Sequence, residues 1–401
     1  MAELSVFAYP WDIADDGPER VVEQLVALGV DRIEVATAYH SVETIRPRRS
    51  ERVHVIPEGN VAHLPIGLSR FGRLVPAHGV LAVEQPALFE RLATSAAAAG
   101  IALSGWTIML HNSALATAVP DAALENCFGD RSGHGLCPLN PAVQEYARAL
   151  AASIAATGYF DELLLESLAF LPAGHGHPHQ LWAVRLDLLG RTLLSLCFCP
   201  SCLDRGAAAE IDGPRLRERV REELDSLWNS PSAGSSPEDE GAELTAAIAR
   251  EPDLAAWTRM RMDAVTELSR TIVTDLDALG TGTVFGAAIW AREASTNWLE
   301  GIDLAALGEL DAGIALMPYY VEAAAVARDL DVATGLAPAA GLQLVQTISP
   351  LHHSGLAALA QKVKLGRERG IERFGLYNFG MAARPQLEWV GEIARLLHSA
   401  T

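Results

Sequence analysis

Residues 162–167 read Glu-Leu-Leu-Leu-Glu-Ser, three leucines followed at once by a carboxylate, Glu166. A short apolar run without alternation is typical of a strand that is buried on both faces, as in a parallel sheet covered by helices. In parallel barrels the chemistry lies at the carboxyl ends of the strands. The stretch therefore predicts a buried parallel strand with Glu166 at its functional end.

Seven other segments are β-like, and helix-like sequence separates most of them. Together the predicted strands are 5–9, 32–36, 101–110, 162–167, 283–290, 312–319, 342–347 and 374–379. Eight strand–helix units in series, largely apolar on both faces, favour a closed parallel (β/α)8 barrel of the TIM type. A doubly wound open sheet is the alternative, but no glycine-rich phosphate loop follows any predicted strand.

We assign residues 1–401 to one barrel domain, with a helical insertion after the fourth strand at about 170–250. Within the insertion, residues 230–241 combine turn formers with acids and predict a mobile surface loop.

Acidic residues outnumber basic ones by 50 to 31, which gives a formal net charge of -19. Such a field repels nucleic acids and anionic membranes, so neither is an expected partner. The apolar stretches are shorter than the roughly 20 residues of a membrane span, and no signal peptide is visible at the start. The expected location is the cytoplasm, and the sequence is compatible with a homo-oligomer.

The carboxyl ends of the predicted strands carry aromatic, amide and carboxylate side chains. Aromatic rings stack on the C–H faces of a sugar while polar groups bond to its hydroxyls, so this set predicts a small carbohydrate or glycoside as the ligand. Phosphate fits less well, because Arg292 is the only permanent cation among these strand ends. The predicted substrate-binding residues are Trp11, Tyr39, His40, Trp106, His111, Asn112, Trp290, Tyr319, Gln346, Tyr377 and Asn378.

Glu166 is the candidate general acid/base. Burial behind three leucines would raise the pKa of its carboxyl group and suit it to proton donation, whereas a helix cap or an ion pair is the competing interpretation. The candidates for a second catalytic carboxylate are Asp12, Glu58 and Glu293.

A His-rich segment offers a different use of Glu166. His175, His177 and His179 alternate, and together with Glu166 they could bind a catalytic metal. A flexible polar loop is the simpler interpretation of this segment, and we favour it.

Three of the five cysteines, Cys197, Cys199 and Cys202, lie within six residues. Cys137 offers a fourth thiolate, and Cys127 is a rival for that place. Four thiolates make a closed tetrahedral site, so the predicted cofactor is a structural zinc ion. Buried free thiols are the alternative. The metal would tie the loop after the third strand to the insertion after the fourth.

The order of these residues resembles the zinc-containing bacterial β-galactosidases, glycoside hydrolase family 42. That family has a zinc-binding cysteine after its third strand, an acid/base glutamate at the end of the fourth, and then a C-x-C-x-x-C motif. Cys137, Glu166 and the cysteines of 197–202 stand in that order here. The resemblance covers about residues 100–205 by motif. It implies a glycoside hydrolase-like barrel with structural zinc and Glu166 as the proton donor.

Two features depart from that family. A His-rich insert lengthens the gap between Glu166 and Cys197. The family's nucleophile is a glutamate at the end of the seventh strand, where this chain has Gln346, and an amide cannot form a glycosyl ester. An inverting mechanism would instead need another carboxylate, placed across the pocket so that a water fits between the two.

The leading hypothesis is an enzyme that cleaves a glycosidic bond with Glu166 as general acid. The second hypothesis is a sugar-binding barrel without catalysis. The third is a metal-dependent lyase or isomerase that uses the cluster of His175, His177 and His179.

Overall fold

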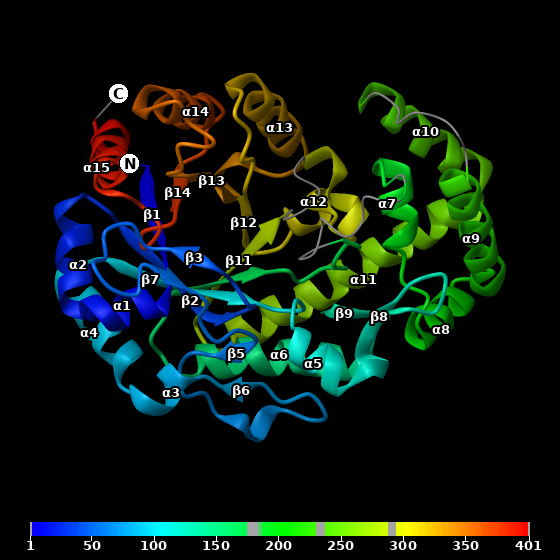
Figure 1. Ribbon diagram of the computed structural model, residues 1–401, viewed down its shortest axis with the longest axis horizontal. Helices are drawn as coiled ribbons and strands as arrows, with labels where there is room; N and C mark the ends of the chain where they lie inside the picture. The colour runs from blue at the N-terminus through cyan, green and yellow to red at the C-terminus, as the bar shows by residue number, and fades with distance from the viewer. Residues whose placement is uncertain (1, 175–183, 185, 230–236, 288–293, 400–401) are drawn as a thin grey trace.

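The computed structural model describes residues 2–174, 184, 186–229, 237–287 and 294–399. Eight parallel strands form a closed barrel, because the first strand pairs with both the second and the last (Figure 1). In order around the barrel they are β1 (Glu3–Ala8), β2 (Arg32–Tyr39), β7 (Ala102–Ile108), β10 (Glu162–Glu166), β11 (Gly282–Ala287), β12 (Gly313–Leu316), β13 (Leu342–Thr347) and β14 (Arg373–Tyr377). Each lies on a predicted segment, so the predicted (β/α)8 barrel is confirmed.

Helices follow the strands and cover the outside of the barrel (Figure 1). The covering helices are α2 (Pro18–Ala27), α4 (Leu88–Ala99), α6 (Pro141–Ala155), α11 (Pro252–Asp277), α13 (Ala323–Leu336), α14 (Leu356–Glu368) and α15 (Arg384–His398). Shorter elements in the connections are α1 (Pro10–Asp16), α3 (Val80–Glu84), α5 (Ser113–Ala118), α12 (Leu304–Leu307), β3 (Thr44–Ile45), β4 (His54–Val55), β5 (Val61–Ala62), β6 (Ala77–His78), β8 (Ala123–Glu125) and β9 (Arg131–Leu136). Helix α6 shows how the sequence sets a boundary. The Asn140 side chain caps it by accepting from the Ala142 N–H, and Pro141 is its first residue.

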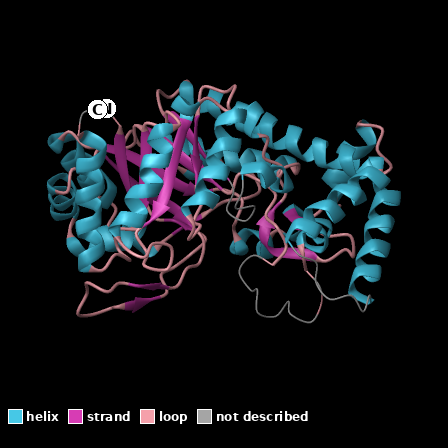
Figure 2. Cartoon of the chain, turned by 90° about the horizontal axis from the view of Figure 1, so that it is seen from above, coloured by secondary structure: helices cyan, strands magenta, loops and turns pink. Residues whose placement is uncertain are grey.

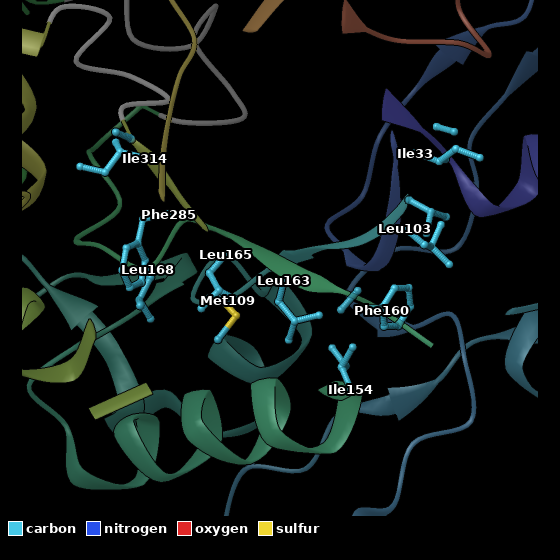
Figure 3. Packing of buried hydrophobic residues seen from close by; sticks show 14 of the residues in the cluster. Ile33, Leu103, Met109, Ile154, Phe160, Leu163, Leu165, Leu168, Phe285 and Ile314 are labelled. Atoms are coloured by element: carbon cyan, nitrogen blue, oxygen red, sulfur yellow. The ribbon is translucent and has the colours of Figure 1, made fainter. Parts of the chain in front are cut away.

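Strand β10 places Glu166 inside the barrel. Successive side chains of a strand point to opposite faces. Leu163 and Leu165 belong to the outer core, which Figure 3 shows between the barrel strands and the helix that carries Ile154, α6. Leu164 belongs to the cluster inside the barrel, so Glu166, two residues further on, shares its inward face.

Side chains fill the barrel interior. The apolar layer consists of Phe7, Tyr9, Trp11, Ala36, Tyr39, Trp106, Ile108, Leu164, Val284, Ala315 and Val345. A polar layer lies closer to the amino ends of the strands, where Gln343 Nε2 donates to Ser5 Oγ at 2.9 Å and to Glu34 Oε1 at 3.0 Å. Because both layers are packed, a ligand can reach the chemistry only from the carboxyl ends of the strands.

The described part of the segment between β10 and α11 contains the helices α7 (Leu188–Leu194), α8 (Pro200–Ala208), α9 (Gly213–Asn229) and α10 (Pro237–Arg250). They lie beside the barrel, as Figures 1 and 2 show, and they share a separate hydrophobic core that includes Phe198, Leu224 and Trp257. The predicted helical insertion is therefore present.

The predicted loop at 230–241 is wrong for residues 237–241, which form the first turn of α10. Pro237 at the first position and acids at Asp239 and Glu240 favour a helix N-terminus, because they suit its free N–H groups and its positive dipole end. Residues 230–236 lie outside the described residues.

No helix among the described residues is both long enough and apolar enough to cross a lipid bilayer.

Candidate active site and metal centre

Glu166 lies at the carboxyl end of β10 and is only 7% exposed. The indole N–H of Trp106, on the neighbouring strand β7, donates to Glu166 Oε2 at 2.6 Å. Burial raises the pKa of Glu166 to about 7, although the hydrogen bond from Trp106 lowers it. A carboxyl group with this pKa is well matched to general acid/base catalysis near neutral pH.

Aromatic rings surround the Trp106–Glu166 pair. The Trp106 ring centroid lies 4.7 Å from that of Tyr39, 5.7 Å from Tyr9 and 5.9 Å from Tyr377. Tyr9 also stacks on Trp11, with 4.4 Å between the centroids. The structure therefore brings predicted substrate-binding aromatics from four parts of the chain to one end of the barrel.

Tyrosine hydroxyls add polar groups to this cluster of aromatic rings. Tyr9 OH lies 2.6 Å from Tyr377 OH and donates to Tyr39 OH at 3.4 Å, and the Tyr319 ring stacks on Tyr377 at 6.4 Å. Burial, with a smaller contribution from the Glu166 charge, raises the pKa of Tyr9, Tyr39, Tyr319 and Tyr377. All four stay neutral at physiological pH, so they can donate hydrogen bonds to a sugar hydroxyl.

Sequence reasoning missed Tyr9 as a site residue. It lies one residue beyond β1, and the alternation from Phe7 gives it an inward position. That alternation was visible in the sequence and could have identified Tyr9.

The other candidate carboxylates do not contact Glu166 in the described part of the chain. Asp12 pairs with Arg46, with 2.7 Å between Oδ1 and Nε, and burial raises the pKa of Asp12 to about 6 against the effect of Arg46. Glu58 is exposed and accepts from the Val80 N–H at 2.7 Å, which caps α3. The pKa of Glu166 responds to burial and Trp106 and to neither of these carboxylates.

Gln346 points away from the barrel mouth. Its Nε2 donates to the carbonyl oxygens of Pro318 at 3.1 Å and Val345 at 3.0 Å. Val345 faces the interior, so Gln346, the next residue, faces outward. The inward position at this end of β13 is Thr347, whose Oγ1 lies 2.9 Å from His352 Nδ1. Gln346 Nε2 is thus engaged by backbone carbonyls, Thr347 is the inward residue at this strand end, and the predicted substrate contact of Gln346 stays a prediction.

The two other predicted amides of the site, Asn112 and Asn378, stabilise the backbone nearby. Asn112 Oδ1 accepts from the Leu115 N–H at 2.9 Å and caps α5. Asn378 Oδ1 accepts from the Gly380 N–H at 2.9 Å. Their amide oxygens are thus engaged in local structure.

Histidines continue the aromatic surface beyond Tyr39. His40 stacks on Tyr39 with 4.4 Å between centroids and on His111 at the same distance. Burial lowers the pKa of His40, so its ring is neutral at pH 7. His134, which the sequence analysis did not identify, packs edge-on against His111 at 6.2 Å.

Several predicted site residues lie outside the described residues. They are Trp290, Glu293 and the cluster of His175, His177 and His179.

The four predicted cysteines meet in one buried cluster. Cys137 follows β9, and Cys197, Cys199 and Cys202 lead into α8. Their sulfur atoms all lie within 4.8 Å of one another, and Cys137 Sγ is 3.5 Å from Cys199 and Cys202 and 3.9 Å from Cys197. A tetrahedral Zn–S distance of roughly 2.3 Å requires about 3.8 Å between sulfurs, so the cluster could hold a metal of this size.

A buried arginine lies beside the cysteine cluster. The Arg261 guanidinium is 1% exposed and stacks over the Phe170 ring at 4.4 Å. Burial lowers the pKa of Arg261, whereas the charges of Cys202, Cys197 and Cys137 raise it. A buried cation needs a nearby negative charge. Four thiolates around one divalent ion carry a net charge of about -2, so they suit Arg261 better than four neutral thiols do.

The raised pKa of Glu166 predicts that Glu166→Gln stabilises the protein at pH 8. The folded-state pKa of about 7 exceeds the ordinary 4.5, so the stability that Glu166 contributes is complete below pH 4.5 and is lost as pH rises through 7. The loss is about 3 kcal/mol, at about 1.4 kcal/mol per pH unit between the two pKa values. Glutamine cannot ionise, so the variant lacks this loss. Urea unfolding of wild type and Glu166→Gln at pH 5 and pH 8 measures this loss. Equal pH dependence of the free energy of unfolding in the two proteins would show that burial does not raise the pKa of Glu166.

A closed eight-stranded parallel barrel with a buried carboxyl group at the end of its fourth strand defines the chain as a (β/α)8-barrel protein. No protein family and no curated protein sequence matches the chain. Solved structures do resemble it, and several of them are glycoside hydrolase barrels.

The PgaB (BpsB) glycoside hydrolase domain from Bordetella bronchiseptica has a TM-score of 0.63 and 14% identity, over 100% of both chains. The catalytic domain of β-amylase from Paenibacillus polymyxa has a TM-score of 0.57 and 12% identity, over 98% of both. A β-galactosidase from Marinomonas ef1 has a TM-score of 0.55 and 10% identity, over 98% of this chain and 59% of that enzyme. At these identities the shared property is the barrel fold.

Proposed function

We propose that the protein is a glycoside hydrolase-like enzyme that cleaves a glycosidic bond with Glu166 as general acid. The observation that carries the proposal is a buried carboxyl group with a pKa of about 7, held by the Trp106 indole among aromatic rings at the barrel mouth. The named hydrolases that share the fold support it. The expected partner is a small carbohydrate or glycoside.

In the proposed reaction Glu166 gives its proton to the oxygen of the departing group as the glycosidic bond breaks. The partly exposed rings of Tyr319 and Tyr377 bind the C–H faces of the sugar, and their hydroxyls bond to its hydroxyl groups, whereas Tyr9, Tyr39 and Trp106 are buried and support them. Glu293, which follows β11 in the chain, stays the candidate base for an attacking water, because β11 pairs with β10.

The pH profile tests the role of Glu166. An acid must be protonated to act, so kcat/KM for an aryl glycoside should fall as pH rises above about 7. Trp106→Phe removes a hydrogen bond that lowers the pKa of Glu166, so the fall should move to higher pH. The same pH dependence of kcat/KM in wild type and Trp106→Phe would show that Glu166 is not the general acid.

We propose zinc as the metal of the cysteine cluster, with a structural role. Four thiolates fill a tetrahedral shell and leave no position for water or substrate. The cluster joins the hairpin of β8 and β9 to α8, because the Glu125 N–H donates to Cys197 Sγ at 3.3 Å. This supports one domain in which the insertion is fixed to the barrel.

The rival proposal is a sugar-binding barrel without catalysis. Its support is the outward direction of Gln346 and the absence of a second carboxylate against Glu166 within the described ranges. A panel of aryl glycosides and sugar titrations by calorimetry separates the two functions. Saturable binding of a sugar without turnover of any glycoside would favour the rival.

A further inference from the structure

Arginines gather at the carboxyl ends of β1 and β14, apart from the site around Glu166. A cavity of about 390 Å³ is lined there by five arginines and two aspartates. The arginines are Arg20, Arg46, Arg48, Arg49 and Arg384. The seven charges give +3 (five minus two), in a chain whose formal net charge is -19. A positive cavity in so acidic a protein needs a specific explanation.

The loop between β3 and β4 brings Arg46, Arg48 and Arg49 to this cavity. Arg46 is 1% exposed and pairs with Asp12 at 2.7 Å and with Asp15 at 2.8 Å. Its Nη1 is buried and has no hydrogen-bond partner among the described residues. Arg46 therefore adds a buried N–H group without an acceptor beside the other arginines of this cavity.

Arg48, which also lines the cavity, holds the segment before α15 in place. Its guanidinium lies 4.5 Å from the Phe379 ring centroid, and its Nη1 donates to the carbonyl oxygens of Phe379 and Ala382. These bonds position the segment that leads into α15. Arg384 is the first residue of this 15-residue helix, and no side chain caps the helix at Ala383. The positive end of the helix dipole therefore adds to the arginine charges.

Arg20 and Arg384 are exposed and have no ion pair or hydrogen bond with any residue that the structure describes. Arg49 pairs with Asp16 at 2.8 Å, so the aspartates neutralise part of the cluster and leave these two arginines uncompensated. Two uncompensated guanidinium groups therefore line this cavity.

We propose that this cavity binds a phosphate group, as inorganic phosphate or as a phosphate monoester. Guanidinium groups from several directions match the oxygens of a tetrahedral anion, whereas a planar carboxylate offers only two. Phosphate sites in (β/α)8 barrels commonly use the loop after the eighth strand and a helix N-terminus, which is where Gly380 and Arg384 stand. The sequence analysis counted one arginine at the strand ends and disfavoured phosphate, because the cluster forms only in the folded chain.

Isothermal titration with inorganic phosphate, glucose 6-phosphate and glucose at low ionic strength tests the proposal. Wild type should bind phosphate saturably, and added salt should weaken the binding. The double variant Arg20→Gln/Arg384→Gln should weaken it at least about tenfold, because it removes two charged hydrogen-bond donors from the cavity. Arg395→Gln, which lies on the same helix and pairs with Glu392, is the matched control and should bind like wild type.

Comparison of the ligands identifies the source of the phosphate. Tighter binding of glucose 6-phosphate than of phosphate, with no binding of glucose, indicates an ester, and equal affinities indicate free phosphate. Equal affinity in wild type and the double variant, or no saturable binding of either phosphate compound by wild type, would overturn the proposal. Glu166→Gln should bind phosphate like wild type, so this result is independent of the proposed hydrolysis.

Discussion

Glu166→Gln is expected to lower kcat/KM for a phenyl glycoside by about 10²- to 10⁴-fold, the usual contribution of general acid catalysis. Glutamine has nearly the same shape and can still accept the Trp106 N–H, which now bonds to Glu166 at 2.6 Å. The loss therefore reports the missing proton rather than a change in packing. Steady-state kinetics of the purified variant measures it.

The size of this loss should depend on the departing group. Phenoxide needs a proton to leave, whereas dinitrophenolate leaves readily without one, so the variant should lose far less activity on a dinitrophenyl glycoside. Glu90→Gln, an exposed change on α4, is the control and should match wild type. Equal losses of kcat/KM on both substrates, or unchanged turnover of the phenyl glycoside, would show that Glu166 is not the general acid.

The barrel and the position of Glu166 could be predicted because both depend on local sequence. The run of Leu163, Leu164 and Leu165 marks a strand buried on both faces, and strand alternation then fixes Glu166 on the inward side. Burial in this place raises the pKa of Glu166, as expected from its apolar neighbours.

The site was predicted less well where a shift of one residue matters. Gln346 and Thr347 both lie at the end of β13, and alternation puts only Thr347 inside. The family pattern points to Gln346 without fixing the register of the strand, and the structure turns that residue outward. Counting from Val345 would have predicted this direction.

Contacts between distant segments could not be predicted at all. Asp12 was predicted as a candidate second carboxylate, and in the structure it pairs with Arg46, 34 residues later in the chain, at 2.7 Å. Nothing local to either residue indicates this pair, because the loop after β2 must first fold back over β1. The same long-range folding assembles the arginine cavity.

Loss of one cysteine ligand is expected to lower the free energy of unfolding by about 4–5 kcal/mol or more, the range typical of losing a structural metal. Cys202→Ala removes one of four thiols whose sulfurs lie within 4.8 Å of one another. Without the metal, the buried Arg261 would lose the thiolate charges beside it and keep the smaller effect of Glu300. The insertion helices, whose core includes Cys197, Cys199 and Cys202, should then become sensitive to protease.

Cys127→Ala is the matched control for this experiment. Cys127 is as fully buried as Cys202 and belongs to the same hydrophobic core, but its sulfur is not part of the four-cysteine cluster. Both variants delete one buried thiol, so the packing loss of about 1 kcal/mol is common to them. The difference in the free energy of unfolding between the two variants therefore measures the contribution of the metal. Elemental analysis should find one zinc per chain in wild type and in Cys127→Ala, and less in Cys202→Ala. Equal stability of the two variants, or a wild-type protein free of metal, would show that the cysteines only pack the core.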